Sequence, residues 1–286
     1  TQSVTNITVT AAIGNGTIVD LNYPDQIQHG VCWNTTGDPT IADFKTEEGA
    51  ATVTGAFTSS ITGLSAYTTY YVRAYAINEA GTVYGNEVTF TTLPVAPTVS
   101  TQAVTEIATS TATGNGNITD LGIPNPAQYG ICWNTTGIPD VLDSKTEEGA
   151  ANLTGAFTSS ITGLSAYTTY YVRAYAINEA DTVYGNEVSF ITLPVAPTVS
   201  TQAVTDITTS TATGNGNITD LGTPNPTQHG VCWNTTGSPD VFSSKTEEGA
   251  ATLTGAFTSS ITGLEAYTTY YVRAYAINEA DRKSVV

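Results

Sequence analysis

Three cysteines, Cys32, Cys132 and Cys232, could form disulfides or bind a metal, and they are spaced 100 residues apart. A disulfide requires Cα atoms within about 7 Å, and each hundred-residue stretch holds a single Cys. A metal site needs further Cys or His ligands, which the sequence does not supply at a regular spacing. We expect buried, inert thiols. The alternative is partial exposure with intermolecular bridging, because Cys132 alternates with Ile131 and Trp133 along one strand.

Histidine is a poor candidate for acid–base chemistry in this chain. His29 and His229 correspond to Tyr129 in the middle of the sequence, which excludes a catalytic or ligand role common to all copies. We expect both histidines in surface loops. Without a regularly placed His, no nucleophile–base triad can be drawn.

Carboxylates are regular, and paired acids could serve a glycosidase or a calcium site. They recur as Asp20, Asp120 and Asp220 and as the pairs Glu47-Glu48, Glu147-Glu148 and Glu247-Glu248. Adjacent Glu residues in a strand point to opposite faces, and no Asp-x-Asp-x-Asp-Gly loop is present. We expect solvated charge, with weak calcium binding as the alternative. No catalytic residue and no cofactor is predicted, so we expect the chain not to be an enzyme.

The composition excludes several classes of partner. The net charge is −17, from 25 acids against 8 bases. Nucleic-acid binders need clustered Lys and Arg, and anionic membrane surfaces disfavour an acidic chain. No apolar run approaches the roughly 18 residues of a spanning helix, so no membrane insertion is expected. Charged residues make up 12% of the chain, and Thr, Ser, Asn and Gly replace them, as is typical of all-β extracellular modules.

The elements that position these residues are set by a repeat with a period of 100 residues and no insertion. Cys32-Trp33 recurs one and two periods later, and the stretch 54–80 recurs unchanged at 154–180. Such a period matches one small domain rather than a solenoid coil. We therefore predict three domains at 1–94, 95–194 and 195–286, here called repeats 1, 2 and 3.

Prolines mark the joints between repeats, in Pro94-Val95-Ala96-Pro97 and Pro194-Val195-Ala196-Pro197. Two prolines three residues apart stiffen the chain and prevent a helix or a central strand. We predict short, semi-rigid linkers and an elongated array.

Each repeat is predicted to be a seven-stranded antiparallel β-sandwich. Helical periodicity is absent, and strand-length segments alternate with turn residues. In repeat 2 we predict strands at 98–107, 109–119, 127–135, 140–147, 152–162, 168–178 and 182–192. Gly14-Asn15-Gly16 and its copies predict a hairpin turn with positive φ. Repeat 3 stops matching at Asp281, so it is expected to lack its last strand.

The clearest alternation runs from Tyr170 to Ala176. The residues of even number, from Tyr170 to Ala176, are expected to be buried, and the odd ones to form a solvent-side stripe of aromatics around an arginine. This stripe, here called the Tyr–Arg face, comprises Tyr71, Arg73, Tyr75, Tyr171, Arg173, Tyr175, Tyr271, Arg273 and Tyr275. We expect sheet-face packing there. The alternative is a face that binds carbohydrate or protein, because exposed aromatics can stack on sugar rings.

Loops offer a second candidate for binding. The repeats differ mainly at 22–29 and 38–44 and their counterparts. Drift of loop sequences is the expected reason. The alternative is a ligand-binding rim at one end of each sandwich, because loops on rigid scaffolds commonly carry function.

The run Leu164-Ser165-Ala166-Tyr167-Thr168-Thr169-Tyr170, followed by alternating small and branched residues, resembles the fibronectin type III signature. With Gly-Val/Ile-Cys-Trp and Val-Tyr-Gly-Asn, it looks like the fibronectin-like and immunoglobulin-like repeats of bacterial secreted and surface proteins. The chain departs from that family in lacking its usual early Trp and the Pro-Gly before the Tyr corner. The resemblance implies tandem β-sandwiches outside the cell or on its surface.

The two ends of the sequence look cut. The residues 281–286 can be encoded by the start of a common short-read sequencing adapter, so we expect this tail to be non-native and the natural gene to carry more repeats. The missing strand would leave an open edge in repeat 3, prone to fraying or to strand exchange with another chain.

The function predicted from these observations is that of a non-catalytic spacer or stalk in a larger extracellular or cell-surface protein, with a connection to adhesion. Its expected partners are further repeats or domains of the same polypeptide. The runner-up is a module that binds a glycan or a surface protein through its loops or through the Tyr–Arg face.

Overall fold

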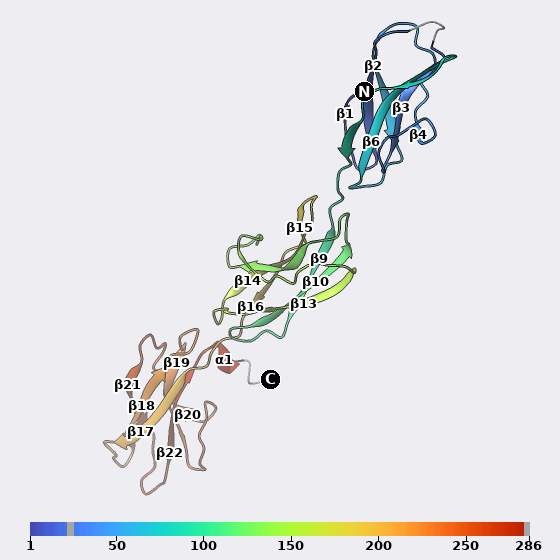
Figure 1. The fold of residues 1–286 in the computed structure, drawn as a ribbon. Coiled ribbons are helices and arrows are strands. Elements are labelled where there is room, and N and C mark those ends of the chain that lie inside the picture. The colour runs from blue at the N-terminus through green and yellow to red at the C-terminus, as the bar shows by residue number, and fades with distance from the viewer. Residues whose placement is uncertain (22–25, 283–286) are drawn as a thin grey trace.

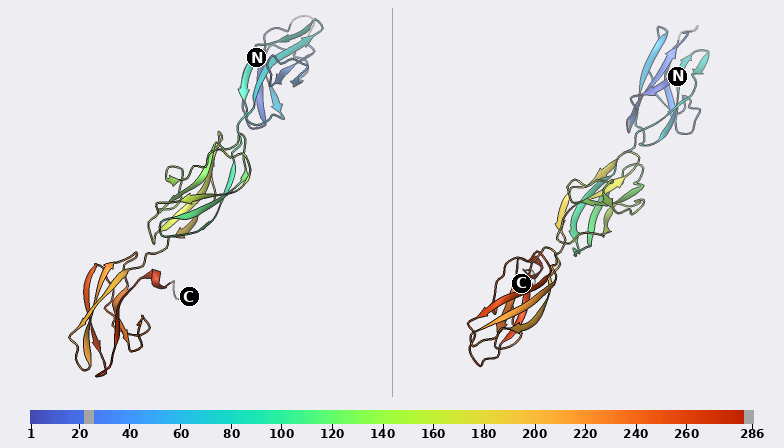
Figure 2. Two further views of the ribbon diagram at one scale, coloured as in Figure 1. Left: turned by 60° about the horizontal axis from the view of Figure 1, so that its bottom comes forward. Right: turned by 90° about the vertical axis from the view of Figure 1, so that its left-hand side faces the viewer.

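The computed structural model describes residues 1–21 and 26–282. The chain is all-β apart from one short helix, and three units follow one another in an elongated row (Figure 1). The two further views keep this extended arrangement (Figure 2). Every sheet is built from strands of a single repeat. The fold class predicted from the sequence is therefore confirmed, while the domain limits 1–94, 95–194 and 195–286 stay predictions.

Repeat 2 is a sandwich of two antiparallel sheets. Its strands are β9 (Thr98–Thr105), β10 (Ala112–Asp120), β11 (Gln128–Asn134), β12 (Ser144–Lys145), β13 (Gly155–Ile161), β14 (Thr169–Ile177), β15 (Thr182–Tyr184) and β16 (Val188–Ile191). One sheet has the order β13-β10-β9, and the other has β12-β11-β14-β15 with β16 also on β14. The predicted last strand is present but is split into β15 and β16 by residues 185–187. The predicted strand 140–147 is mostly loop, with two residues in β12.

Repeat 1 has the same layout. Its strands are β1 (Gln2–Thr5), β2 (Ala11–Ile18), β3 (Gln28–Asn34), β4 (Phe44–Lys45), β5 (Gly55–Thr62), β6 (Thr69–Asn78), β7 (Gly81–Tyr84) and β8 (Val88–Thr91). The sheets have the orders β1-β2-β5 and β4-β3-β6-β7, with β8 on β6.

In repeat 3 the residues up to Arg282 form no counterpart of β15 or β16, in agreement with the prediction. Its elements are β17 (Thr198–Thr205), β18 (Thr211–Asp220), β19 (Gln228–Asn234), β20 (Ser244–Lys245), β21 (Gly255–Thr262), β22 (Tyr271–Ile277) and helix α1 (Glu279–Arg282). The second sheet has only the order β20-β19-β22 among the described residues. The origin of the tail 281–286 stays a prediction, and residues 283–286 lie outside the described part of the chain.

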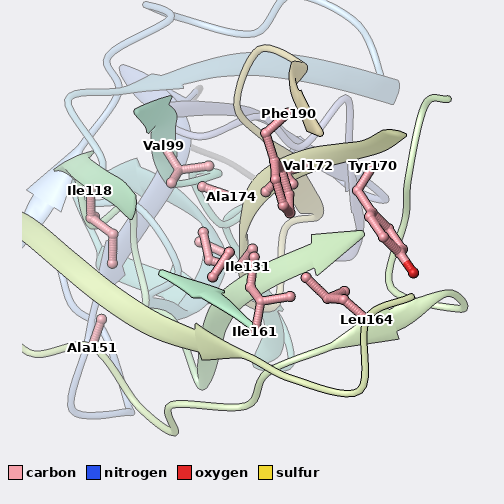
Figure 3. Packing of buried hydrophobic residues seen from close by; sticks show 12 residues of the cluster. Val99, Ile118, Ile131, Ala151, Ile161, Leu164, Tyr170, Val172, Ala174 and Phe190 are labelled. Atoms are coloured by element: carbon pink, nitrogen blue, oxygen red, sulfur yellow. The ribbon is translucent and has the colours of Figure 1, made fainter. Parts of the chain in front are cut away.

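The core of repeat 2 confirms the predicted burial of the even-numbered residues of β14. Tyr170, Val172, Ala174 and Ala176 are all buried, and they pack with residues of both sheets such as Ile131. Figure 3 shows the labelled side chains pointing into the space between the sheets. The prediction that each repeat encloses an apolar interior fits this packing, because burial of such side chains is the main favourable term in folding.

The prediction of a hairpin turn at Gly14-Asn15-Gly16 is wrong. These residues lie inside β2, paired with β5, and neither glycine has a positive φ. A Cβ on Gly14 would approach a methyl group of Val31 to 2.9 Å, and one on Gly16 would collide with the ring of Phe57. Glycine is needed here because side chains of the core press against the strand backbone.

Candidate functional site

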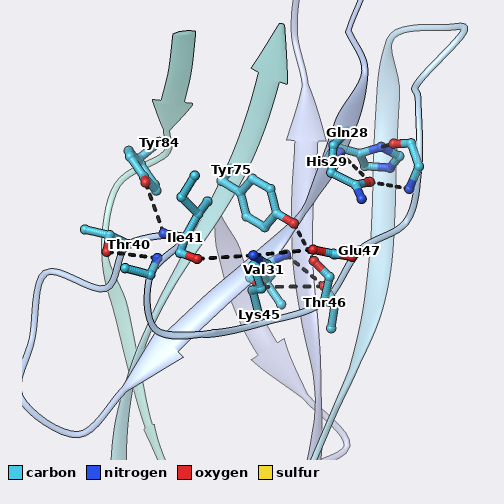
Figure 4. Close-up of polar contacts among 12 residues, drawn as sticks. Gln28, His29, Val31, Thr40, Ile41, Lys45, Thr46, Glu47, Tyr75 and Tyr84 are labelled. Carbon is cyan, nitrogen blue, oxygen red and sulfur yellow. Dashed lines mark hydrogen bonds and ion pairs between the residues drawn. The ribbon is translucent and has the colours of Figure 1, made fainter.

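The Tyr–Arg face is partly covered, which corrects the prediction of an exposed stripe. Tyr75, Tyr175 and Tyr275 are buried, with exposed fractions of 3%, 0% and 6%. The segment that follows β3 crosses over this face and pairs through β4, so that Cys32 lies opposite Lys45. The hydroxyl of Tyr75 donates to the backbone oxygen of Thr46 at 2.5 Å (Figure 4).

The three tyrosines at this position share one arrangement. Tyr175 donates to Thr146 O at 2.6 Å, and Tyr275 donates to Thr246 O at 2.5 Å. Burial raises the pKa of Tyr75 to about 12, and the charge of Glu47 adds to the effect. A tyrosine that fastens a covering segment is unavailable for a sugar ring. Its role is to hold the segment 44–48 against the sheet.

The arginine of the face packs on a tyrosine that sequence reasoning did not select. The guanidinium of Arg73 lies 4.6 Å from the ring centroid of Tyr84, and its Nε donates to Gly85 O at 3.1 Å. The hydroxyl of Tyr84 accepts a hydrogen bond from the amide of Ile41 at 3.1 Å (Figure 4). The cation–π contact that we predicted therefore exists, but with a partner on β7 instead of a neighbour on β6.

Repeat 2 has the same cluster as repeat 1. Arg173 lies 4.4 Å from the centroid of Tyr184, whose hydroxyl accepts from Val141 N. In the described part of repeat 3 no strand lies at the position of β15, and both Arg273 and Tyr271 are exposed. Sequence reasoning could have identified Tyr84 as the partner of Arg73. The segment Val-Tyr-Gly-Asn would be expected to pair with the strand that carries Arg73, and the structure places its Tyr84 opposite Tyr75.

The cysteines are buried, which agrees with the favoured prediction. Cys32, Cys132 and Cys232 have exposed fractions of 0%, 0% and 1% and are free thiols. Burial raises the pKa of Cys32 to about 11 and that of Cys132 to about 12, against the opposing charges of Arg73 and Arg173. A thiol held protonated inside the protein is a weak nucleophile.

His29 and His229 lie on strands β3 and β19, so the prediction that they lie in surface loops is wrong. His29 belongs to β3 (Figure 4), and its Nδ1 is 2.7 Å from Gly49 O. Its ring meets the Phe57 ring edge-on at 4.8 Å. Tyr129 makes the same edge-on contact with Phe157 at 4.8 Å. An aromatic ring is what this position requires, which explains the exchange of His for Tyr.

The carboxylates do not gather. Glu47, Glu147 and Glu247 each pair with the lysine two residues earlier, at 3.3, 3.4 and 3.3 Å. The carboxylate of Glu87 accepts a hydrogen bond from the amide of Asp38 at 2.5 Å and so fastens the loop 38–44. Within residues 1–21 and 26–282, no three His, Cys, Asp or Glu side chains lie close enough to hold a metal ion. Residues 22–25 of the predicted rim are outside the described part.

The joint between repeats 1 and 2 is held by backbone hydrogen bonds to both repeats. Leu93 is tied to repeat 1, since its amide donates to Thr8 O at 3.1 Å and its oxygen accepts from Tyr67 N at 3.2 Å. Val95 is tied to repeat 2, since it exchanges two backbone hydrogen bonds with Ile123, at 2.7 and 2.9 Å. Pro94 alone separates these two anchored residues.

The second joint repeats this pattern. Leu193 is bonded to Ala108 and Tyr167 of repeat 2, and Val195 exchanges backbone bonds with Thr223 of repeat 3. Each linker therefore belongs to the two sandwiches that it connects, with one proline between them. The predicted semi-rigid linker is shorter than its four-residue motif indicates.

A glycine and an asparagine form the seat for the linker on repeat 2. Gly122 has a φ of +68°, and a Cβ there would collide with Val95 O and come within 2.7 Å of the carbonyl carbon of Ala96. The buried Asn178 donates from Nδ2 to Val95 O at 2.7 Å and to Pro124 O at 2.8 Å. Gly222 and Asn278 form the equivalent seat on repeat 3, as the same contacts with Val195 and Pro224 recur.

Two antiparallel sheets in each repeat, of three and five strands in repeats 1 and 2, define a tandem array of antiparallel β-sandwiches. None of the described helices is long and apolar enough to cross a membrane. No protein-family model matches the sequence, and no curated protein matches it. Among solved structures, the chain is similar to the FN1–FN3 domains of chicken CNTN1, with 13% identity over 97% of this chain and 92% of that chain. The TM-score of this match is 0.29.

Proposed function

We propose that this chain is a stiff, non-catalytic spacer segment of an extracellular or cell-surface protein. It holds other repeats or domains of the same polypeptide at a distance, as a stalk does. The observation that carries the proposal is the joint. Leu93 and Val95 are each hydrogen-bonded to a different sandwich with one proline between them, so few backbone angles remain through which the repeats could bend.

Two further features support a spacer. Each repeat packs an apolar core from its own strands, so the array can be lengthened without changing any unit. The net charge of −17 favours separate, soluble chains over self-association.

The runner-up, glycan or protein binding through the Tyr–Arg face, has weaker support. Tyr75 and its counterparts are buried, and Arg73 is occupied by Tyr84 and Gly85. The loop 38–44 is fastened to Glu87 and Tyr84, so a ligand would find a fixed loop edge instead of an aromatic stripe.

Small-angle scattering from the full chain tests the spacer. The comparison chain carries Gly-Gly-Ser-Gly inserted after Pro94 and again after Pro194, which frees both joints. We expect a rod-like distance distribution for the natural sequence and a broader, more compact one after the insertions. Indistinguishable curves for the two chains would refute a stiff spacer, and specific binding on a glycan array would favour the runner-up.

A further inference from the structure

The smaller sheet of every repeat has one free edge, formed by β5, β13 or β21. In repeat 2, β13 pairs with β10 in continuous register, without a bulge, and β10 pairs on its other side with β9. Repeats 1 and 3 have the corresponding orders β1-β2-β5 and β17-β18-β21. Within residues 1–21 and 26–282, no strand pairs with the outer side of these three strands. Each edge therefore presents backbone amides and carbonyls that a further strand could bond.

The opposite side of the sandwich is closed by contacts between the two sheets. In repeat 2, β9 packs against β15 and β16. The hydroxyl of Thr101 accepts a hydrogen bond from Ala174 N at 2.9 Å, and Thr101 N donates to Asn186 Oδ1 at 3.3 Å. On the side of β13, the corresponding contact is a bond between two side chains, from Ser159 Oγ to Glu148 Oε1 at 2.7 Å. The backbone of β13 is left accessible by this contact.

The free edges have no charged residue and no proline. Residues 155–161 have the sequence Gly-Ala-Phe-Thr-Ser-Ser-Ile, and the segments 55–61 and 255–261 are identical to it. Ala156, Thr158 and Ser160 are exposed, whereas Ser159 and Ile161 are buried. Proteins commonly protect a free edge with lysine, proline or a bulge. An edge without these features is suited to strand addition.

An apolar groove of about 360 Å³ lies beside the start of β13. Side chains from both sheets and from the preceding loop line it, among them Tyr129, Leu153 and Phe157. Leu153 is 83% exposed, and its counterparts Val53 and Leu253 are 73% and 81% exposed. An apolar side chain on an added strand would fill this groove and remove Leu153 from water, which is favourable.

The rim of the free edge is acidic. Glu148 is exposed, and its carboxylate accepts the hydrogen bond from Ser159. In repeats 1 and 3 the equivalent atoms, Ser59 Oγ and Ser259 Oγ, are buried and have no hydrogen-bond partner among the described residues. The equivalent carboxylates are therefore not held by the serine in those repeats. A carboxylate that is exposed and not fixed in one place is available to a lysine or arginine of a partner.

We propose that the free edge of each repeat binds an extended, cationic segment of a different protein, which adds to β5, β13 or β21 as an outer strand. Backbone bonds give affinity, and selectivity comes from an apolar side chain in the groove and from a Lys or Arg beside Glu48, Glu148 or Glu248. A second copy of this chain is a poorer partner, because it brings the same acidic rim and a net charge of −17. Equal sites in three repeats strengthen the binding of a partner that carries several such segments.

The test uses the full chain and the synthetic peptide Lys-Val-Thr-Phe-Thr-Val-Lys, which matches β13 in its length of 7 residues. We expect saturable binding in isothermal titration and slower amide hydrogen exchange in residues 155–161 and their two copies. The same peptide with N-methyl groups on its internal residues keeps every side chain but cannot donate backbone bonds. It should bind at least about 10-fold more weakly. A peptide with Glu in place of both Lys residues should also bind more weakly.

A pair of chain variants separates the acidic rim from the overall charge. Glu48→Gln, made together with the same change at the equivalent positions of repeats 2 and 3, should weaken binding of the peptide about 3-fold. The matched control is Glu79→Gln with its two equivalents, which changes the net charge equally at the turn after β6 and its counterparts. This control should bind as the natural sequence does.

Four results would overturn the proposal. They are no saturable binding of the unmodified peptide, equal binding of the methylated peptide, unchanged exchange in residues 155–161, and equal weakening by the two sets of Glu variants. A dimer of the chain that the peptide dissociates would identify a second copy as the occupant and would contradict the assignment too. None of these results bears on the scattering test, because the free edges take no part in the joints.

Discussion

The side-chain amide of Asn178 donates a hydrogen bond of 2.7 Å to the backbone oxygen of Val95, which joins the end of β14 to the linker from the preceding repeat. The same amide also reaches Pro124 O. Asn278 makes the corresponding pair of bonds in repeat 3. The direction of the linker is thus set by a buried side chain and by its proline together.

Replacing this amide should loosen the first joint. Asn178→Ala removes both bonds, so that Pro124 O loses this donor and Val95 O keeps only the bond from Ile123 N, at a cost of about 1–3 kcal/mol. We expect a lower free energy of unfolding of repeat 2 in urea and a broader distance distribution between repeats 1 and 2. Asn78→Ala is the matched control, because Asn78 ends β6, whereas the linker residue Leu93 is bonded to Tyr67, just before the start of that strand. An equal effect of both variants on the joint would contradict this role.

Gly122 should tolerate no side chain. Comparison with Gly149 separates the effect of positive φ from the effect of collision with the linker. Gly122→Ala imposes a positive φ on alanine and drives its Cβ into Val95 and Ala96. Gly149→Ala imposes a similar φ of +82° with no atom within 4 Å. The strain alone costs about 1–2 kcal/mol, so G149A should lower stability modestly and leave the joint intact. G122A should lower stability further and detach the linker, as measured by urea unfolding and by the distance between repeats. If G122A left the distance between the repeats unchanged, Gly122 would not be needed for the linker to pack on repeat 2.

The covered tyrosines should contribute to stability through their hydroxyls. We expect the triple variant Tyr75→Phe, Tyr175→Phe and Tyr275→Phe to lose about 1 kcal/mol per repeat, since each leaves a carbonyl of the covering segment unpaired. The control is the triple Phe variant at 71, 171 and 271, whose side chains are more exposed. The variant at 75, 175 and 275 should have the lower midpoint of thermal unfolding of the two. Equal midpoints would show that the hydroxyls do not fasten the segment.

Stability should fall in alkali, because burial keeps thiols and phenols protonated. The folded pKa is about 11 for Cys32 and about 12 for Cys132, against 9.0 for an ordinary thiol. The unfolded state loses these protons first, so stability is intact below pH 9 and declines as the pH rises from about 9 toward 12. Tyr75 and Tyr275, with pKa values of about 12 against 10.0, extend the decline.

Urea unfolding at a series of pH values measures this decline. A chain with all three cysteines replaced by Ala should lose less stability between pH 9 and 11 than the natural sequence does. A thiol reagent should react slowly with the folded chain and fully with the unfolded one. Rapid reaction of the folded chain at pH 8 would contradict burial of the thiols.

Strand periodicity together with the resemblance predicted the fold, because most inward positions of a strand are apolar and the repeat displays this pattern three times. The even-numbered residues from Tyr170 to Ala176 are an example. What faces the opposite side of the sheet could not be predicted from one strand. Tyr75 is buried by a segment nearly thirty residues earlier, and local alternation carries no information about that cover.

The glycines illustrate a second limit. Gly14 and Gly16 look like a turn because glycine usually supplies positive φ, yet they serve close contact with the core side chains Val31 and Phe57. Gly122 does have a positive φ, but a side chain is also excluded there because the linker passes directly over this residue. Only the three-dimensional neighbours distinguish these uses.

The stiffness of the joint is tested most directly by the distance between spin labels on adjacent repeats. Labels attached at Thr58→Cys and Thr158→Cys, both on exposed strand positions, in a chain whose native cysteines are replaced by Ala, report the angle at Pro94. We predict a single narrow distance distribution that widens strongly when Gly-Gly-Ser-Gly is inserted after Pro94. A broad distribution in the uninserted chain, unchanged by the insertion, would contradict a joint held by Leu93 and Val95.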